Sequence, residues 1–371
     1  MKRVKLRTPK KDELKGAQRS TAKLIRRFAI RGASGFIALL VIEYFVLPEL
    51  AGFRKSLHLI TQANYLLVVV GIVLEALSLS AYGKLTQTLL PVRNRPSYSQ
   101  ILRIDLASLS VSHVLPGGTA SGAGLSLRLM NSSGVSGADT GFAIATQGIG
   151  SALVLNALLW VSLIVSIPFA GFNKLYLTVA LLGAVLIGVA ASLIYLFTKG
   201  KRHSLEILTT VTKRLPLLRR FDFIGAFEKI GQRVTSLMAD PDLLKRAAIW
   251  ATLNWILDAG SLWVMLAAFG RVVNPDYLLV AYSVANVMAV LPITPSGLGV
   301  IEAFSTLLLV QFFSVPRGIA ILGVITWRLF NFWVPIPVGV VSYVSLKISS
   351  GRGAADVTME LDKIDSPPEL E

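Results

Sequence analysis

The sequence contains no cysteine and only three histidines, His58, His113 and His203. Without cysteine, the chain cannot form disulfides, thiolate metal sites or iron–sulfur clusters. The three histidines are too far apart in the sequence for the spacing that zinc sites use. We therefore expect neither a metal nor another cofactor.

Charged residues are also scarce, because they make up 16% of the 371 residues while 53% are hydrophobic. A soluble domain has about 25% charged residues. Three long segments, 140–173, 175–198 and 277–301, contain no charge at all, and about 20 apolar residues are enough to span a bilayer. The fold class expected is therefore an all-α polytopic membrane protein, since a membrane β-barrel would show short alternating segments instead.

Acidic residues are outnumbered, with 21 Asp and Glu against 37 Lys and Arg. Eleven of the basic residues fall in the first 27 positions and eleven more in segment 199–246. Basic clusters beside apolar runs are typical of cytoplasmic loops and attract anionic lipids. We therefore expect no nucleic-acid partner, and we predict a multi-pass protein of the cell membrane with both termini in the cytoplasm.

Charge and hydropathy together predict six full crossings and a simple domain organisation. The crossings are expected at about residues 32–50, 64–82, 151–170, 175–197, 247–269 and 318–346. The last is longer than a bilayer requires, and Pro335 and Pro337 are expected to kink it. The domains predicted are a basic cytoplasmic tail (1–27), a transmembrane domain (28–347) and a disordered cytoplasmic tail (348–371). The loop at 199–246 has amphipathic periodicity, which fits helices lying in the membrane interface or docked on other cytoplasmic loops.

Two further apolar stretches, 99–150 and 277–315, are interrupted by proline and glycine. The basic flanks place both ends of the first stretch on the cytoplasmic side, and the crossing count places both ends of the second outside. We expect two re-entrant broken-helix hairpins that enter from opposite faces, although hydropathy leaves open that some arms cross fully.

The two broken stretches share a motif, in which Val-Leu-Pro is followed by a short spacer and Ser-Gly-x-Gly. Three crossings separate the two copies, and an odd number inverts their orientation, so the pattern indicates an inverted repeat. Pro116 and Pro292 should then lie at comparable depths in the membrane. The hairpin-motif residues are Pro116, Gly118, Gly122, Gly124, Pro292, Ser296, Gly297 and Gly299.

Ionisable residues near these stretches are the candidate binding site, because a charge in mid-membrane costs at least about 2.5 kcal/mol and needs a partner or a cavity. We expect Arg128, Glu302 and Arg328 to line one cavity, with Asn331 nearby and a surplus positive charge that suits a phosphate-bearing head group. The alternative is a set of ion pairs that only hold helices together. The other candidates are Asp139 and Asp258, the less certain Glu43 and Glu75, and His113, which is either an acid–base group or a hydrogen-bonded structural residue.

Three sequence elements resemble the lysylphosphatidylglycerol synthase transmembrane-region family of bacterial and archaeal flippase-like membrane proteins. They are the Leu-Pro-Gly-Gly motif before Arg128, the Gly-Leu-Gly-x-x-Glu element that ends at Glu302, and the segment 327–333. The resemblance covers about residues 28–347. Family members often carry an acidic residue between the first glycine motif and the arginine, and segment 124–128 has none. The synthases of the family add a soluble aminoacyl-transferase domain, which we do not expect here.

The resemblance and the broken helices predict a transporter of the flippase type, which moves a phospholipid or lipid-linked glycan between leaflets. Its partners are expected to be membrane lipids with an anionic head group. The sequence contains no P-loop and no His-Glu-x-x-His motif, so we do not expect an enzyme. Two alternatives stay open, a membrane-embedded lipid head-group transferase and a non-catalytic accessory subunit that partners a lipid-modifying enzyme. The oligomeric state is not predicted.

Overall fold

The computed structural model of the protein describes residues 61–115, 118–170, 240–289 and 297–349, with scattered positions between 177 and 192. All of them belong to one compact unit, residues 52–371. Every regular element in these ranges is helical, which confirms the all-α prediction. The elements are α3 (Tyr65–Leu89), α4 (Tyr98–Val114), α5 (Thr119–Ser132), α6 (Gly137–Ala170), α10 (Pro241–Ala268), α11 (Pro275–Ala289), α12 (Val300–Gln311), α13 (Arg317–Arg328), the π-helix η5 (Leu329–Trp333) and α14 (Pro335–Ser349).

Four helical stretches are long and apolar enough to cross a membrane: α3, α6, α10 and the stretch from α13 to α14. Three of them coincide with the crossings expected at 64–82, 247–269 and 318–346. The crossing expected at 151–170 belongs to a longer helix, because α6 has 34 residues and is about 51 Å long. The expected broken stretch therefore ends before residue 137 and not at 150.

Several predictions concern residues that lie wholly or mostly outside the described ranges. These are the crossings at 32–50 and 175–197, the tails 1–27 and 348–371, and the loop 199–246.

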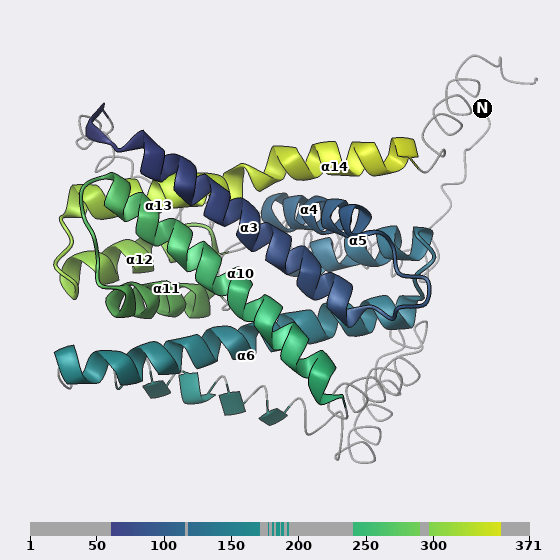
Figure 1. Ribbon diagram of the computed structural model, residues 1–371, viewed down its shortest axis with the longest axis horizontal. Helices are drawn as coiled ribbons and strands as arrows, with labels where there is room; N and C mark the ends of the chain where they lie inside the picture. The colour runs from purple at the N-terminus through teal and green to yellow at the C-terminus, as the bar shows by residue number, and fades with distance from the viewer. Residues whose placement is uncertain are drawn as a thin grey trace, which may run out of the picture. The chain divides into compact units, whose positions relative to one another are not determined.

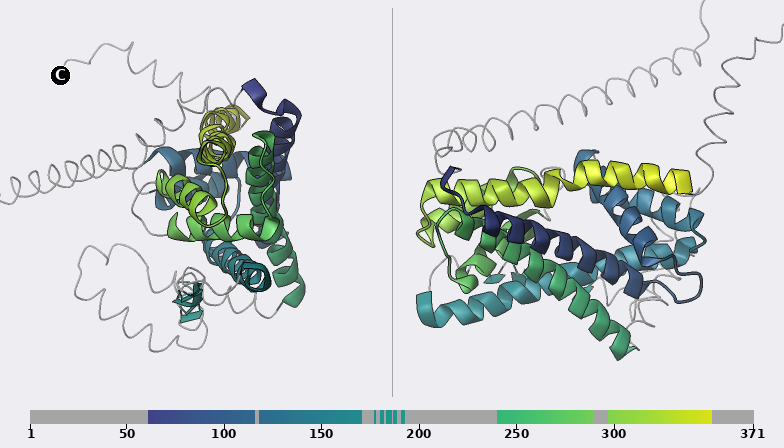
Figure 2. Two further views of the ribbon diagram at one scale, coloured as in Figure 1. Left: turned by 90° about the vertical axis from the view of Figure 1, so that its left-hand side faces the viewer. Right: turned by 45° about the horizontal axis from the view of Figure 1, so that its top comes forward.

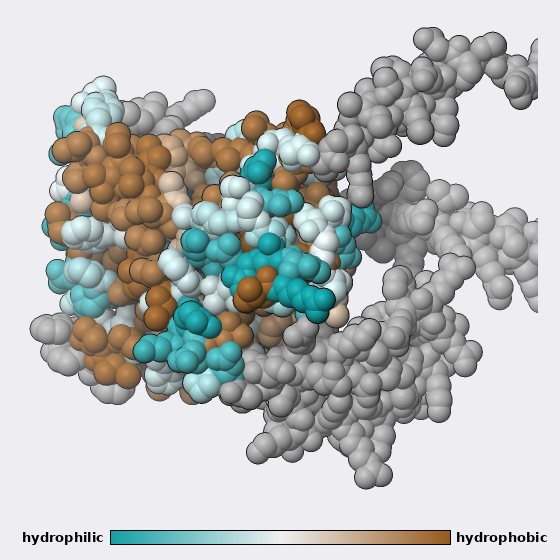
Figure 3. Space-filling view, turned by 45° about the vertical axis from the view of Figure 1, so that its right-hand side comes forward, coloured by the Kyte–Doolittle hydropathy of each residue, from teal (hydrophilic) through white to brown (hydrophobic). Residues whose placement is uncertain are grey.

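Large apolar side chains remain exposed along the outer helices. Leu66, Val69 and Val73 of α3 and Val341 and Val344 of α14 are examples. Figure 3 shows a hydrophobic area beside a hydrophilic one on one face of the molecule. An extended apolar surface of this kind suits contact with lipid tails, and the chain is accordingly a membrane protein.

The helices α3 and α10 form a close antiparallel pair (Figure 1). The Ser261 hydroxyl donates to the Gly71 carbonyl (2.9 Å), and the Ser78 hydroxyl donates to the Asn254 carbonyl (3.0 Å). From Gly71 to Ser78 the chain advances seven residues along α3, while the partner on α10 moves back seven residues, from Ser261 to Asn254. The two helices are therefore antiparallel. Small and polar residues at the contact are typical of helix packing in membranes.

Each broken stretch folds into a helical hairpin, and the two hairpins begin at opposite ends of the α3–α10 pair (Figures 1 and 2). In the first, α4 and α5 are antiparallel, since Gln100 donates to the Ser133 hydroxyl (3.0 Å). In the second, α11 and α12 are antiparallel, since the rings of Tyr277 and Phe313 stack 4.8 Å apart. The tips, which include Pro116, Pro292 and Ser296, lie outside the described residues, so their membrane depth stays a prediction.

The second helix of each hairpin begins after a glycine in the left-handed region. Gly118 precedes α5 with φ 47°, and Gly299 precedes α12 with φ 82°. Residues with a Cβ rarely adopt these angles. Both hairpins thus turn into their second helix through a glycine with positive φ, although the shared motif aligns Gly299 with Gly124, which lies inside α5.

The helical stretch from α13 to α14 is interrupted near Pro335, as expected, but the interruption is a π-turn, which the sequence does not predict. The helix passes through the π-turn η5 and resumes as α14 at Pro335. The Val334 amide bonds to the Leu329 carbonyl (2.8 Å), five residues back. Pro335 and Pro337 have no amide hydrogen to donate, so the regular α-helical ladder cannot continue through them. Single π-turns are frequent at functional sites.

The contact between α14 and α4 leads to a prediction for stability. A Cβ on Gly339 would overlap the Leu106 carbonyl oxygen, so Gly339→Ala should lower stability by about 1–3 kcal/mol through overpacking. Gly148 of α6 has open space around it. Gly148→Ala should therefore be neutral or stabilising by up to about 1 kcal/mol. Thermal unfolding of both variants in detergent tests this, and equal melting temperatures would contradict the close α4–α14 contact.

Candidate functional site

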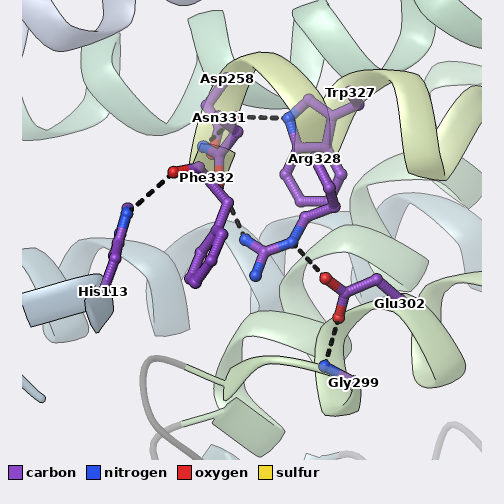
Figure 4. A network of polar contacts seen from close by, with 8 residues as sticks. All are labelled: His113, Asp258, Gly299, Glu302, Trp327, Arg328, Asn331 and Phe332. Atoms are coloured by element: carbon purple, nitrogen blue, oxygen red, sulfur yellow. Dashed lines mark hydrogen bonds and ion pairs between the residues drawn. The ribbon is translucent and has the colours of Figure 1, made fainter. Parts of the chain in front are cut away.

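An ion pair between α12 and α13 forms one side of the site. Arg328 Nε donates to Glu302 Oε1 at 2.7 Å, with the arginine side chain 5% exposed and the glutamate side chain 14% exposed (Figure 4). Glu302 Oε2 accepts the Gly299 amide (2.8 Å), which fixes the carboxylate at the N-terminus of its own helix. The glycine motif therefore orients the acidic partner of Arg328.

Asn331 of η5 connects this ion pair to two further carboxyl groups. Its Oδ1 accepts from Arg328 Nη1 (3.0 Å). Its Nδ2 donates to Asp258 Oδ1 (3.1 Å) and to Glu75 Oε1 (3.2 Å). Side chains from α3, α10, α12, α13 and η5 thus meet in one network, which we call the central network: Glu75, Asp258, Glu302, Arg328 and Asn331.

Asp258 accepts more hydrogen bonds than any other member of the central network. Besides Asn331, the Tyr282 hydroxyl donates to its Oδ2 and the Trp327 indole donates to its Oδ1, both at 2.6 Å. The three donors come from α11, α13 and η5. A buried carboxylate is tolerated when donors of this kind satisfy it, so Asp258 joins three elements to α10.

Aromatic rings enclose the guanidinium of Arg328. Its central carbon lies 4.6 Å from the centre of the Phe332 ring. His113 of α4 stacks on the same ring (4.2 Å between centres), and its Nδ1 is 3.0 Å from the Phe332 carbonyl oxygen. This hydrogen bond fits the second role expected for His113, that of a hydrogen-bonded structural residue. Arg328 Nη2 is buried without a hydrogen-bond partner among the described residues.

The structure brings together four of the six expected binding residues: Asp258, Glu302, Arg328 and Asn331. Glu75, whose depth in the membrane the sequence does not fix, joins them. Tyr282 and Trp327 were not candidates. Trp327 lies beside Arg328 in the sequence, whereas no pattern marks Tyr282.

Arg128 does not lie in the central network, contrary to expectation. It is near the end of α5, which returns antiparallel to α4 so that Ser133 reaches Gln100. Arg128 lies beside Gln100 and Ile104 of α4. His113, which marks the level of Arg328, is nine residues further along α4 than Ile104, or about 14 Å. The expected surplus of positive charge is also not found there, because the central network combines one guanidinium with three carboxyl groups.

Asp139 also lies outside the central network, in the first turn of α6. Its Oδ2 accepts from the Ser136 hydroxyl (2.7 Å), and its amide donates to the Ser136 Oγ (3.1 Å). This reciprocal arrangement is typical of helix capping.

Arg128 lines a separate pocket of about 340 Å³ between α4, α5 and α14. The lining combines apolar side chains such as Leu129 and Leu346 with the polar or basic side chains of Gln100, Arg128 and Lys347. We call it the Arg128 pocket. Neighbouring Arg103 donates to the Ser345 hydroxyl (3.1 Å), so this end of α4 and α14 carries several cations.

The remaining hairpin-motif glycines have distinct surroundings. Gly122 faces Ser112 and the Ser108 carbonyl so closely that α5 could not pack there with a side chain. Gly124 has open space, and a Cβ on Gly297 would meet the Ala289 side chain. Gly122 and Gly297 thus allow close packing within the two hairpins.

Comparison with known proteins supports a membrane family. The family profile described as "Lysylphosphatidylglycerol synthase TM region" matches residues 33–339. The chain is also similar to a "UPF0104 membrane protein" of Methanothermobacter thermautotrophicus, with 25% identity over 207 residues. That alignment covers 52% of this chain and 57% of the relative's length.

Proposed function

Because the chain belongs to the lysylphosphatidylglycerol synthase transmembrane-region family, we propose that it is a flippase-type transporter that moves a phospholipid or lipid-linked glycan between leaflets. The observation that carries the proposal is the central network, a set of ionisable groups buried between membrane-length helices. Groups of this kind in a membrane segment mark substrate or ion pathways.

The Arg328 guanidinium supports a role in binding an anionic head group. Its Nε and Nη1 are occupied by Glu302 and Asn331, whereas Nη2 is buried without a partner among the described residues. Buried donors are rarely left unpaired. A phosphate oxygen is a strong acceptor for a guanidinium and would satisfy Nη2.

The Arg128 pocket supports an initial docking step. Its mixture of leucines with Arg128 and Lys347 suits a lipid whose phosphate meets the cations while its glycerol and acyl groups contact apolar walls. The pocket lies where α14 and α5 end, beside the loop that carries Arg93 and Arg95. By the positive-inside rule this end faces the cytoplasm.

A leaflet-resolved assay tests the function. The purified chain is reconstituted in vesicles of phosphatidylethanolamine and phosphatidylglycerol that contain a fluorescent phosphatidylglycerol, and an impermeant reductant bleaches the outer leaflet. We expect bleaching beyond the outer-leaflet fraction, which protein-free vesicles do not show. Fluorescent analogues of other lipids, including a lipid-linked glycan, identify the substrate. Protection of the inner leaflet for every lipid would contradict the proposal.

The orientation leads to a separate prediction, which the absence of cysteine makes simple to test. Val92 and Val272 are both exposed in loops, at opposite ends of the antiparallel α3–α10 pair (83% and 68% exposed). With the basic end in the cytoplasm, an impermeant maleimide on intact cells should label Val272→Cys but not Val92→Cys. Labelling of Val92→Cys alone would reverse the proposed orientation.

A further inference from the structure

Two buried carboxyl groups of the central network share one amide donor. Glu75 of α3 and Asp258 of α10 are 3% and 6% exposed. Both accept from the same nitrogen, Asn331 Nδ2, at 3.2 and 3.1 Å. The two carboxyl groups are therefore neighbours in a site that is shielded from water.

The two groups differ in how well their oxygens are satisfied. Asp258 accepts from three donors: Tyr282, Trp327 and Asn331. Among the described residues, Glu75 accepts a hydrogen bond from Asn331, and its Oε2 is buried with no donor. Hydrogen bonds to the ionised form favour that form, so the donors are arranged for an ionised Asp258 and not for an ionised Glu75.

The surrounding charges do not compensate for two ionised groups. Arg328 of α13 is bound directly to Glu302 of α12 and reaches the carboxyl pair only through Asn331. The other titratable groups facing the pair are the Tyr282 hydroxyl of α11 and, beyond Phe332, His113 of α4. α6 contributes none at this level, since its one ionisable side chain is Asp139 in the first turn.

We infer that Glu75 and Asp258 form a proton-binding site, in which Glu75 carries a proton that it gives up and regains as the transporter changes conformation. A proton on Glu75 removes the charge from a carboxyl group whose Oε2 has no donor among the described residues. It also lets Glu75 share a hydrogen bond with the neighbouring Asp258 and removes the repulsion between two like charges in a buried site. The inference rests on the proposed transport function for its coupling step, but the proton site itself does not depend on it.

The geometry also provides a route for coupling. Asn331 contacts both the carboxyl pair and Arg328, and it lies on the π-turn η5 between α13 and α14. Loss of the proton would leave two negatively charged carboxylates next to Asn331 Nδ2 and attract this nitrogen toward them. Asn331 Oδ1 would still hold the guanidinium of Arg328. Because Glu75 is shielded in this conformation, proton exchange requires the helices to open, which links the proton to the movement that exposes the lipid site.

Infrared spectroscopy tests the proton site without any transport. The full chain in vesicles of phosphatidylethanolamine and phosphatidylglycerol should show the carbonyl stretching band of a protonated carboxylic acid. Glu75→Gln should lose the part of the band that arises from glutamate, and Asp105→Asn, which changes another buried carboxyl group on α4, should retain that part. Carbon-13 labelling of glutamate in the unaltered protein should shift the band even if the variant fails to fold. If labelled glutamate shifts no part of the band, or if the part that it shifts survives Glu75→Gln, the assignment is overturned.

Transport under an imposed pH gradient tests the coupling. With fluorescent phosphatidylglycerol as the probe, the unaltered protein should move lipid at different rates when the gradient is reversed. Glu75→Gln should lose this difference. If no lipid moves, the proposed function fails while the infrared result still decides the proton site. If lipid moves at the same rate in both gradients although the band is present, the coupling is wrong.

Discussion

Arg328→Gln is expected to abolish lipid translocation while leaving the protein folded and inserted. Glutamine keeps a hydrogen-bonding group at the end of α13 but removes the charge that pairs with Glu302 and the Nη2 donor that a phosphate would meet. Arg328→Lys should retain partial activity, since the charge remains without the planar fork. The fluorescent-lipid assay in vesicles measures all of these rates.

The matched control is Arg317→Gln at the start of the same helix, where the side chain is exposed. It should transport at the rate of the unaltered protein. Normal transport by Arg328→Gln would contradict a role in binding.

A double replacement distinguishes a role of Arg328 in head-group binding from a purely structural role of its ion pair. If the Glu302–Arg328 pair only holds α12 against α13, then Glu302→Gln with Arg328→Gln should be tolerated better than either single change, because a single change leaves one buried charge unpaired. If Arg328 contacts the head group, the double variant should be as inactive as Arg328→Gln alone. Transport by the double variant, measured beside its thermal stability, decides between these outcomes.

Asp258→Ala is expected to have the largest effect on stability. It leaves the buried donors of Tyr282 and Trp327 without their acceptor, and it removes one of the two acceptors of Asn331 Nδ2. Each unsatisfied group costs about 1–3 kcal/mol, and a folded protein is stable by only about 5–15 kcal/mol in total. We expect most of the protein to aggregate in detergent during size-exclusion chromatography.

Asp242→Ala on the same helix is the control for this change. Asp242 is exposed in the first turn of α10, where a carboxylate contributes only about 0.3–1 kcal/mol through the helix dipole. Asp258→Asn should be intermediate, since one acceptor oxygen remains. If Asp258→Ala is as stable as Asp242→Ala, the central network does not hold α10 to its neighbours.

Hydropathy could predict the helices because the requirement of the bilayer for about 20 apolar residues is local in sequence. The crossings at 64–82 and 247–269 correspond to α3 and α10 for this reason. The start of α6 could not be predicted in the same way, since its first turns are less apolar and its beginning is set by the Ser136–Asp139 cap.

The central network could be predicted in part because a charge in an apolar segment needs a partner. This argument identifies Asp258, Glu302 and Arg328 one by one but does not say which of them meet. Arg128 satisfies the same criterion, yet the antiparallel return of α5 brings it to the other end of α4. Tyr282 could not be predicted, because a tyrosine in an apolar helix has no pattern that distinguishes a hydrogen-bonded side chain from a packed one.

The inverted repeat stays a prediction in its detail, although the two hairpins start at opposite ends of the α3–α10 pair. Gly118 and Gly299 each precede the second helix of their hairpin. The shared motif does not pair these two glycines, because it aligns Gly122 and Gly124 with Gly297 and Gly299. Its Ser-Gly-x-Gly part therefore lies within α5 in the first hairpin and before α12 in the second. Apart from Pro335 and Pro337, which follow it, no sequence pattern predicts the π-turn.

Photocrosslinking with a lipid tests most directly whether the central network meets the substrate. A phosphatidylglycerol with a photoreactive head group is incorporated in vesicles with the purified protein, irradiated, and the modified peptides are identified by mass spectrometry. The account predicts modification within segment 327–332, which is lost in Arg328→Gln and kept in Arg317→Gln. Modification confined to the lipid-facing side chains of α3 and α14, with none in segment 327–332, would contradict it.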